Sequence, residues 1–357
     1  MRIALLAHVR QPIAQPFRGG MEAHSWLLAR GLAARGHDVV LFASGDSDPR
    51  FEIDPVVAEH YDRLFPWAEH RGTPALIAHL DEAYDAACDR IAAGGFDVLH
   101  NNSLSRLPLQ GRRTSLTPTV TSLHVPPFDG LHYFVRQSPA ETHRITVTST
   151  SQRYFWWPEG APDRVDVLAN GIDVADWPFV AEGDGTAVWT GRMVDTKGPH
   201  LAAQAARQAG IALTLFGPIE DPDYWRRDVE PVLGGDIRYG GHLGQRELAG
   251  EIGRRSVALF TPRWEEPFGL SAIEAMACGL PVAAFDRGAA REVIAEAGAF
   301  APGDDVAGLA AAIAKALAID RAAARDRVLA NFTVETWLDR CEDLYAKVSA
   351  ARGRNAP

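Results

Sequence analysis

The sequence predicts an α/β protein built from two doubly wound halves, each a parallel sheet with helices on both faces. Short apolar runs alternate with helix-length stretches, this alternation restarts after the turn-rich stretch 170–185, and 357 residues suit two domains of about 150 residues each. Continuously apolar strands are typical of a parallel sheet that is covered on both faces. We predict domains at 1–168 and 169–335 that face each other across a central cleft, with 336–357 crossing back to the first domain.

The first half begins with a strand candidate at 2–7, followed by a loop with Gly and Pro and by a helical pattern that Gly36 ends. The opening apolar run soon meets His8, Arg10 and Pro12, so we interpret it as a strand and not as a signal peptide. The later elements expected in this half are strands at 38–43, 97–100, 119–123 and 145–149 and a helix at about 73–93.

The second half repeats the alternation. Its expected elements are a helix from about 198 and strands at 186–191, 211–217, 236–241, 256–262 and 281–285. The last segment, 334–350, has the pattern of an amphipathic terminal helix, and we expect the tail from 351 to be frayed.

Composition excludes several classes of protein. The net charge of −10 opposes an electrostatic grip on nucleic acid or on an anionic membrane. No apolar run reaches the roughly 18 residues of a membrane span. The three cysteines, Cys88, Cys278 and Cys341, lack the spacing of a zinc site or a disulfide framework, and we expect a cytoplasmic protein.

The strongest functional signal is the block EEPFGLSAIEAMACGLPV at 265–282, in which seven residues separate Glu266 from Glu274. A helix that starts near Gly269 or Leu270 would point free backbone amides at the carboxyl edge of a sheet, which makes an anion site. Both carboxylates could then face one small ligand, and an ionised carboxylate can accept two hydrogen bonds from sugar or ribose hydroxyls. Taken singly, Glu274 fits a solvated helix position equally well.

A second signal is WTGRMVDTKG at 189–198, directly after a strand candidate. Arg192 at the strand end and Lys197 at the mouth of the next helix could converge with that helix on a diphosphate. Only three lysines occur in the chain, which makes a lysine in this setting more informative. The alternative is an ordinary surface arginine and lysine.

Two weaker signals lie in the first half. The pair Gly19 and Gly20 allows the backbone to approach a ligand where the first helix begins, with Glu22 in its first turn. His124 ends a strand at the expected ligand edge, although a lone histidine is more often structural. The D-x-D stretches at 46–48 and 221–223 match a metal-binding pattern, but they are also common turn chemistry.

Seven blocks, in one order along nearly the whole chain, resemble a known family. They are GGME (19–22), SLH (122–124), NGID (170–173), GRMVDTKG (191–198), FGP (216–218), GGHL (240–243) and the block at 265–282. In these residues the chain resembles the retaining, GT-B-fold glycosyltransferases of family 4, also described as glycosyl transferases group 1. The resemblance implies two Rossmann-like domains and a C-terminal helix that crosses back to the N-terminal domain.

The resemblance also implies which residues bind the nucleotide-sugar donor. In the second half, Arg192 and Lys197 would hold the diphosphate and stabilise the leaving group, and Glu274 would hold the ribose. The other implied donor-binding residues of this half are Glu266, Phe268, Gly269 and Leu270 for the sugar, and His242 and Leu243 for the base.

In the first half, the resemblance assigns Gly19 and Gly20 to the diphosphate, Glu22 to the acceptor, and His124 to the donor sugar's hydroxyls. The implied catalytic residues are His124, Glu266, Arg192 and Lys197. No metal ion or other cofactor is expected, because cationic side chains already serve the diphosphate. One departure concerns the acceptor side: Asn101 and Asn102 stand where many relatives have a further histidine.

The expected activity is retaining transfer of a hexose, with UDP-glucose favoured as donor, to a hydroxyl of a sugar, a lipid-linked sugar or a small molecule. Glu266 is expected to position the sugar without forming a covalent intermediate. The alternatives are a GDP-mannose-dependent mannosyltransferase, a GT-B-fold sugar-nucleotide epimerase, and a sugar-nucleotide-binding protein without catalysis. The sequence leaves open the base, the sugar, the acceptor, the oligomeric state and a weak peripheral membrane contact.

Overall fold

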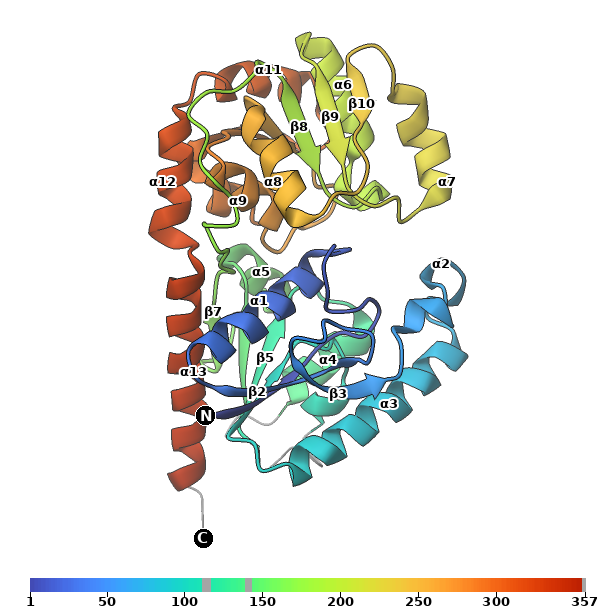
Figure 1. Ribbon diagram of the computed structural model, residues 1–357, viewed down its shortest axis with the longest axis vertical. Helices are drawn as coiled ribbons and strands as arrows, with labels where there is room; N and C mark the ends of the chain where they lie inside the picture. Colours follow the sequence, from blue (N-terminus) through green and yellow to red (C-terminus); the bar gives the residue numbers. More distant parts are fainter. Residues whose placement is uncertain (111–116, 139–142, 355–357) are drawn as a thin grey trace. The chain divides into compact units, whose positions relative to one another are not determined.

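The computed structural model describes residues 1–110, 117–138 and 143–354, and these form two compact units (Figure 1). Unit 1 consists of residues 1–148, 153–168 and 337–357, and unit 2 of residues 149–152 and 169–336. Each unit contains one parallel sheet with helices on both faces, as the sequence predicted.

Unit 1 contains a seven-stranded sheet in the order β3-β2-β1-β4-β5-β6-β7, in which all strand pairs are parallel. The strands are β1 (Arg2–Leu6), β2 (Asp38–Ser44), β3 (Glu52–Val57), β4 (Val98–Asn101), β5 (Thr119–Leu123), β6 (His143–Val147) and β7 (Val165–Val167). The helices of four or more residues are α1 (Gly20–Ala34), α2 (Trp67–His70), α3 (Pro74–Ala93), α4 (Asp129–Gln137), α5 (Thr150–Trp156) and α13 (Val334–Arg354). The first three residues of α5 and of α13 belong to unit 2.

Alternate residues of the central strands of unit 1 serve opposite faces of the sheet. Ala4, Leu6 and Leu99 pack with α3 in one hydrophobic cluster. The neighbouring residue His100 points to the other face, where its ring is hydrogen-bonded to the Tyr345 hydroxyl of α13. α13 therefore covers the face opposite α3, where it also packs on α1.

Unit 2 contains a six-stranded parallel sheet in the order β10-β9-β8-β11-β12-β13. The strands are β8 (Ala187–Thr190), β9 (Leu213–Phe216), β10 (Ile237–Tyr239), β11 (Val257–Phe260), β12 (Val282–Phe285) and β13 (Gly298–Ala301). The helices are α6 (Pro199–Ala209), α7 (Pro222–Tyr224), α8 (Gln245–Arg254), α9 (Leu270–Ala277), α10 (Ala290–Ile294), α11 (Val306–Ala316) and α12 (Arg321–Asn331). Side chains of α6 and α11 share one hydrophobic cluster, and those of α8, α9, α10 and α12 share the other.

The order of both sheets reverses at one point. In unit 1 the chain winds outward on either side of the β1–β4 pair, and in unit 2 on either side of the β8–β11 pair. In open α/β sheets, ligands bind outside the carboxyl ends of the strands at such a switch point. We therefore expect the ligand site of unit 2 at the loops after β8 and β11.

The structure corrects some expected elements. The strands β3, β7 and β13 were not predicted: β3 carries Pro55 at the edge of its sheet, and the other two are short. No element was predicted for 44–72, which contains β3 and α2, or for 125–138, which contains α4. The terminal helix does not end at residue 350 but continues to Arg354, so part of the tail expected to fray is helical.

Candidate active site

The loops that follow β8 and β11 are tied to each other at the switch point of unit 2. The backbone N–H of Arg263 donates to the carbonyl of Thr196 at 2.8 Å. The Thr261 hydroxyl donates to the carbonyl of Lys197 at 2.9 Å. These bonds hold the segment around Lys197, which ends a short 3₁₀ turn (Asp195–Lys197), against the segment that leads to Glu266.

Lys197 and Glu266 meet directly, although they are 69 positions apart in the sequence. The Lys197 ammonium donates to Glu266 Oε2 at 2.5 Å, and the indole N–H of Trp264 donates to the same oxygen at 2.6 Å. The side chain of Glu266 is 9% exposed and that of Lys197 is 21% exposed. A nearly buried carboxylate thus has a cationic partner, as buried charges require.

Arg192 lies two residues beyond β8 and pairs with a different carboxylate. Its Nη1 donates to both oxygens of Glu220, at 2.8 and 2.9 Å. Glu220 follows β9, at the same carboxyl edge of the sheet, and sequence reasoning did not single it out. Each predicted phosphate-binding cation therefore already has an anionic partner, which a diphosphate would have to replace or share.

Helix α9 begins at Leu270, as predicted from the PFGL turn. Its N-cap residue Gly269 has φ +101°, and a Cβ at that position would lie 2.7 Å from Cζ of Phe260. This left-handed conformation and close approach require glycine. Phe268 is buried, so its side chain belongs to the core and only its backbone remains for a ligand.

Glu274 lies one turn inside α9, and none of the described residues gives its carboxylate a hydrogen bond or an ion pair. Desolvation raises the pKa of this carboxyl to about 7, although the residue keeps some exposed surface. A carboxyl group with this environment in an α/β sheet's ligand region is a candidate for binding hydroxyls. The structure thus separates the two carboxylates: Glu266 is ion-paired, whereas Glu274 is not.

The GGHL segment follows β10 (Ile237–Tyr239). Leu243 packs against the hydrophobic cluster of α8 and α9, which gives this residue a structural role. His242 is half-buried. The predicted contacts of both residues with a base stay predictions.

In unit 1, Gly19 is the N-cap of α1, Gly20 is its first residue, and Glu22 is buried in its first turn. His124 follows β5 and is half-buried. Its Nε2 is 3.4 Å from Oδ1 of Asn102, and desolvation lowers the pKa of His124 to about 4, so the ring is neutral at pH 7.

A cluster of tilted aromatic rings packs around His124 and was not foreseen from the sequence. The centroid of His24, in α1, lies 4.1 Å from that of His124 and 4.7 Å from that of Trp337, in α13. Asn102, one of the two asparagines noted as a departure from the family, contacts His124 through Oδ1 and Ser25 Oγ through Nδ2. The sequence gave no sign of these contacts, because they join residues of separate elements that are far apart in the chain.

The aspartates of both D-x-D stretches have structural partners. Asp48 accepts from Arg50 and from the Trp26 indole, which lowers its pKa, and Asp46 is 2.5 Å from a ring nitrogen of His60. Asp221 caps α7 by accepting from the N–H groups of Asp223 and Tyr224. Within residues 1–110, 117–138 and 143–354, no three His, Cys, Asp or Glu side chains are grouped to hold a metal ion.

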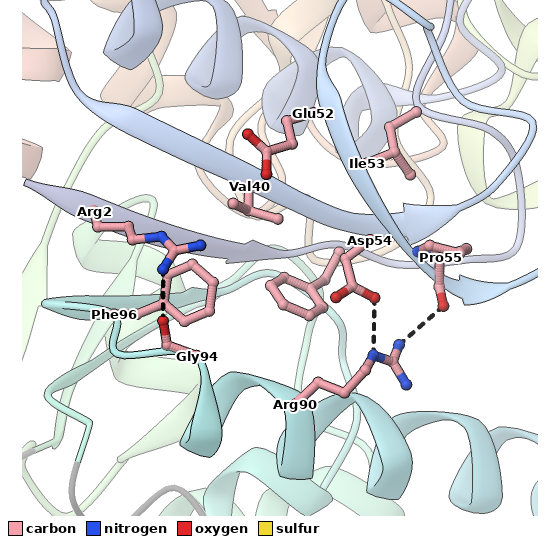
Figure 2. A pocket seen from close by; sticks show the side chains of 10 residues that line it. Arg2, Val40, Glu52, Ile53, Asp54, Pro55, Arg90, Gly94 and Phe96 are labelled. Carbon is pink, nitrogen blue, oxygen red and sulfur yellow. Dashed lines mark hydrogen bonds and ion pairs between the residues drawn. The ribbon is translucent and has the colours of Figure 1, made fainter.

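A cavity of about 410 Å³ lies elsewhere in unit 1 (Figure 2). Its lining includes Arg2 at the start of β1, Val40 and Phe42 within β2, and residues 52–55 of β3, whereas His124 follows β5. Its two arginines are engaged: Arg2 donates to the carbonyl of Gly94, and Arg90 donates to Asp54 and to the carbonyl of Pro55 (Figure 2). None of the predicted site residues lines this cavity.

Comparisons with known proteins define the class. Residues 18–176 match the family Glycosyltransferase Family 4, and residues 178–329 match Glycosyl transferases group 1. The glycogen synthase of Mycobacterium tuberculosis is 33% identical, and the match covers 100% of this chain and 97% of that protein. The chain therefore belongs to the GT-B-fold glycosyltransferases of family 4.

The names of further relatives describe different glycosyl transfers. A phosphatidyl-myo-inositol mannosyltransferase of Mycolicibacterium smegmatis is 28% identical, covering 88% of this chain and 84% of the relative. A D-inositol 3-phosphate glycosyltransferase of Frankia alni is 26% identical, covering 80% and 83%. Glycosyltransferase activity is common to these names, whereas donor and acceptor vary.

Solved structures agree with the fold. The sucrose-phosphate synthase of Thermosynechococcus elongatus matches with a TM-score of 0.75 at 23% identity, covering 98% of this chain and 100% of the other. Anabaena HepE in complex with UDP and glucose matches with a TM-score of 0.72 at 16% identity, covering 97% and 99%. Among the described residues, no helix combines the length and apolar character that a membrane span requires.

Proposed function

We propose that this glycosyltransferase moves a hexose from a nucleotide-diphosphate sugar to a hydroxyl acceptor with retention of configuration, and we favour UDP-glucose as donor. The observation that carries the proposal is the meeting of Lys197 and Glu266 at the switch point of unit 2, beside the first turn of α9. A cation, a carboxylate and free backbone amides are what a diphosphate joined to a sugar needs. The complex of HepE with UDP and glucose supports this donor class.

The proposed roles follow from these contacts. Lys197 and Arg192 bind the diphosphate and stabilise the charge that builds up as it departs, an effect worth about 3 to 4 kcal/mol for one lost contact of this kind elsewhere. Glu274 accepts hydrogen bonds from the ribose, and the backbone amides at Phe268, Gly269 and Leu270 face the sugar. His242 and Leu243 lie toward the base.

For unit 1 we propose that His124 binds hydroxyls of the donor sugar, that Gly19 and Gly20 approach the diphosphate, and that Glu22 serves the acceptor. His124 acts as a neutral ring, because its pKa of about 4 keeps it uncharged at pH 7. We also propose that no metal ion is required, since Lys197 and Arg192 supply positive charge and the D-x-D aspartates have structural partners.

Glu266 is proposed to orient the sugar and to stabilise positive charge on it. Oε2 already accepts hydrogen bonds from Lys197 and Trp264, which weakens this oxygen as a nucleophile. Attack of the acceptor on the same face as the departing diphosphate then gives retention without a covalent enzyme intermediate. A glycosyl adduct trapped on Glu266 would contradict this mechanism.

A GDP-mannose-dependent mannosyltransferase is the second candidate, and the similarity to a phosphatidyl-myo-inositol mannosyltransferase favours it. To test both, the protein is incubated with UDP-glucose or GDP-mannose and with glycogen, phosphatidylinositol vesicles or inositol phosphate as acceptors. Release of nucleotide that requires one acceptor, with an α-linked product by proton NMR, supports the proposal. Nucleotide release without acceptor, or conversion of the donor to an epimer, would favour the isomerase alternative.

A further inference from the structure

Trp264 joins Lys197 and Glu266 in a compact set of three side chains, which we name the Lys–Trp–Glu cluster. The indole N–H donates to Glu266 Oε2 at 2.6 Å, and the same oxygen accepts from the Lys197 ammonium at 2.5 Å. The ammonium nitrogen also lies 5.1 Å from the centroid of the Trp264 ring. Each member of the cluster thus contacts the other two.

The loop that carries Trp264 and Glu266 is fixed by its neighbours. The carbonyl of Glu266 accepts from the N–H of Ala289 at 2.8 Å, and the carboxylate of Glu265 accepts from the N–H of Gly288 at 3.0 Å. A Cβ at Gly288 would lie 2.3 Å from the backbone nitrogen of Glu266. The backbone beneath the Lys–Trp–Glu cluster therefore has little room to move. A change of hydrogen-bond partners in the cluster would involve the side chains alone.

Binding of a nucleotide-sugar donor would give the Lys197 ammonium a second anionic partner. A diphosphate carries more negative charge than one carboxylate, so the ammonium would turn toward a bound diphosphate, and Glu266 would then lose its cationic partner. A carboxylate that is 9% exposed cannot remain without a donor at low cost. The Trp264 N–H is the one other described group that donates to the Glu266 carboxylate, and Oε1 receives no hydrogen bond from any described residue.

We infer that Trp264 is a positioning residue that holds Glu266 Oε2 while Lys197 is engaged with the diphosphate, so that Oε1 stays aimed at a hydroxyl of the transferred sugar. This inference rests on the proposed function. It makes a specific distinction: loss of the indole N–H weakens binding of the sugar nucleotide more than binding of the nucleotide alone, because only the sugar nucleotide also loses the contact with Oε1. Loss of Lys197 weakens both.

The test compares binding of UDP and of UDP-glucose, by calorimetry, to wild type and to Trp264→Phe, with GDP and GDP-mannose as the pair if UDP does not bind. Phenylalanine keeps a ring beside Lys197 but removes the N–H. A hydrogen bond to a charged group is worth enough to predict an affinity for UDP-glucose weakened about 10-fold or more, with UDP weakened to a smaller extent. The matched control is Trp225→Phe, a tryptophan of unit 2 that packs on Tyr239.

Fluorescence gives a second readout, which reports whether Lys197 moves away from the indole when UDP binds. UDP that draws Lys197 away from the indole alters Trp264 emission. The emission change at saturating UDP should therefore be present in wild type and in Trp225→Phe, and reduced in Trp264→Phe. Trp264→His keeps an N–H at the equivalent ring position and should restore UDP-glucose affinity, which keeps the test valid if Trp264→Phe does not fold.

Two outcomes overturn the inference. One is equal weakening of UDP and UDP-glucose in Trp264→Phe, and the other is no weakening of either. If wild type binds none of the four nucleotides, the proposed function itself fails; if wild type binds them and Trp264→Phe behaves like wild type, the inference about Trp264 alone fails.

Discussion

At the scale of single residues, the two glutamates of the 265–282 block have opposite environments. Glu266 has an ion pair and an indole donor, whereas the carboxyl of Glu274 is desolvated and its pKa is raised to about 7. The same residue type, at two positions separated by seven residues, thus has an environment suited to a different task at each position. One carboxylate is held in a fixed orientation, and the other can gain hydrogen bonds from a ligand.

Glu274 predicts a pH dependence of nucleotide binding. Ribose hydroxyls that donate to the carboxylate stabilise its charged form and lower its pKa from about 7, so binding releases protons. UDP affinity should therefore rise as pH increases from about 6 to about 8. Calorimetry at pH 7 in two buffers with different ionisation enthalpies measures the proton release directly.

The variant Glu274→Gln should bind UDP about 10-fold more weakly at pH 8, because a charge-assisted hydrogen bond becomes a neutral one. Its affinity should no longer depend on pH, and it should release no protons. Glu247→Gln, an exposed glutamate in the first turn of α8, serves as the control. Unchanged proton release in Glu274→Gln would show that another group titrates.

Gly288 predicts a backbone constraint on the site. It has φ +59°, and a Cβ would lie 2.3 Å from the nitrogen and 2.4 Å from the oxygen of Glu266. Gly288→Ala should reduce the free energy of unfolding by roughly 1 to 3 kcal/mol and weaken UDP-glucose binding, because the loop that carries Glu266 must shift. Calorimetric unfolding and binding measure the two effects.

The control for Gly288→Ala is Gly250→Ala. Gly250 lies within α8, where a Cβ would have no atom within 4 Å. Alanine there should raise stability by up to about 1 kcal/mol through its higher helix propensity. Equal effects of the two substitutions would argue against a constraint at Gly288.

At the scale of elements, α13 is held against the rest of unit 1 by polar contacts as well as by apolar packing. The buried His100 ring is hydrogen-bonded to the Tyr345 hydroxyl at 2.6 Å and to Ser122 Oγ at 2.8 Å. Burial lowers the pKa of His100 to about 3, so the ring is neutral at pH 7. At the helix start, Trp337 packs on His24, which in turn packs on His124.

Tyr345→Phe should destabilise unit 1 by about 1 to 3 kcal/mol, because it leaves a buried ring nitrogen of His100 without its partner. Hydrogen exchange of the β4 amides, Val98–Asn101, should become faster than in wild type. Tyr133→Phe, at an exposed tyrosine of α4, should leave exchange unchanged. If β4 exchanges at the wild-type rate in Tyr345→Phe, the hydroxyl does not stabilise this face.

Elements also show what sequence patterns can predict. The strongly apolar strands β1, β2, β8 and β11 were predicted because alternation of strand and helix signals is local. β3 was missed because Glu52, Asp54 and Pro55 interrupt its apolar pattern, which an edge strand tolerates. β13, with sequence GAFA, was missed because small residues carry little strand propensity.

The candidate site shows the same limit of prediction from sequence patterns. Arg192, Lys197, Glu266 and Glu274 were predicted from their positions at strand and helix ends. The contacts of Arg192 with Glu220 and of Glu266 with Trp264 were not, because strand order decides which loops become neighbours and no spacing in the sequence records it. Two features of the sequence could have indicated these contacts. They are Glu220, an acidic residue after the FGP block, and Trp264, two residues before Glu266.

At the scale of the whole molecule, two parallel sheets each place their switch point beside predicted site residues. In unit 2 the loops after β8 and β11 bring Lys197 to Glu266, and in unit 1 His124 follows the strand next to β4. The family match over both halves agrees with this arrangement. The central claim is that the loops after β8 and β11 bind the diphosphate of a sugar nucleotide through Lys197.

The most direct test is calorimetric binding of UDP, GDP and ADP without metal and then with magnesium, using wild type, Lys197→Ala and the control Lys315→Ala. Lys315 is an exposed lysine of α11 in the same unit. We predict selective, magnesium-independent binding of one nucleotide, preserved in Lys315→Ala and weakened at least about 100-fold in Lys197→Ala, as expected for the loss of a cation from a phosphate site. Failure of all three nucleotides to bind, strict dependence on magnesium, or unchanged binding to Lys197→Ala would contradict the claim.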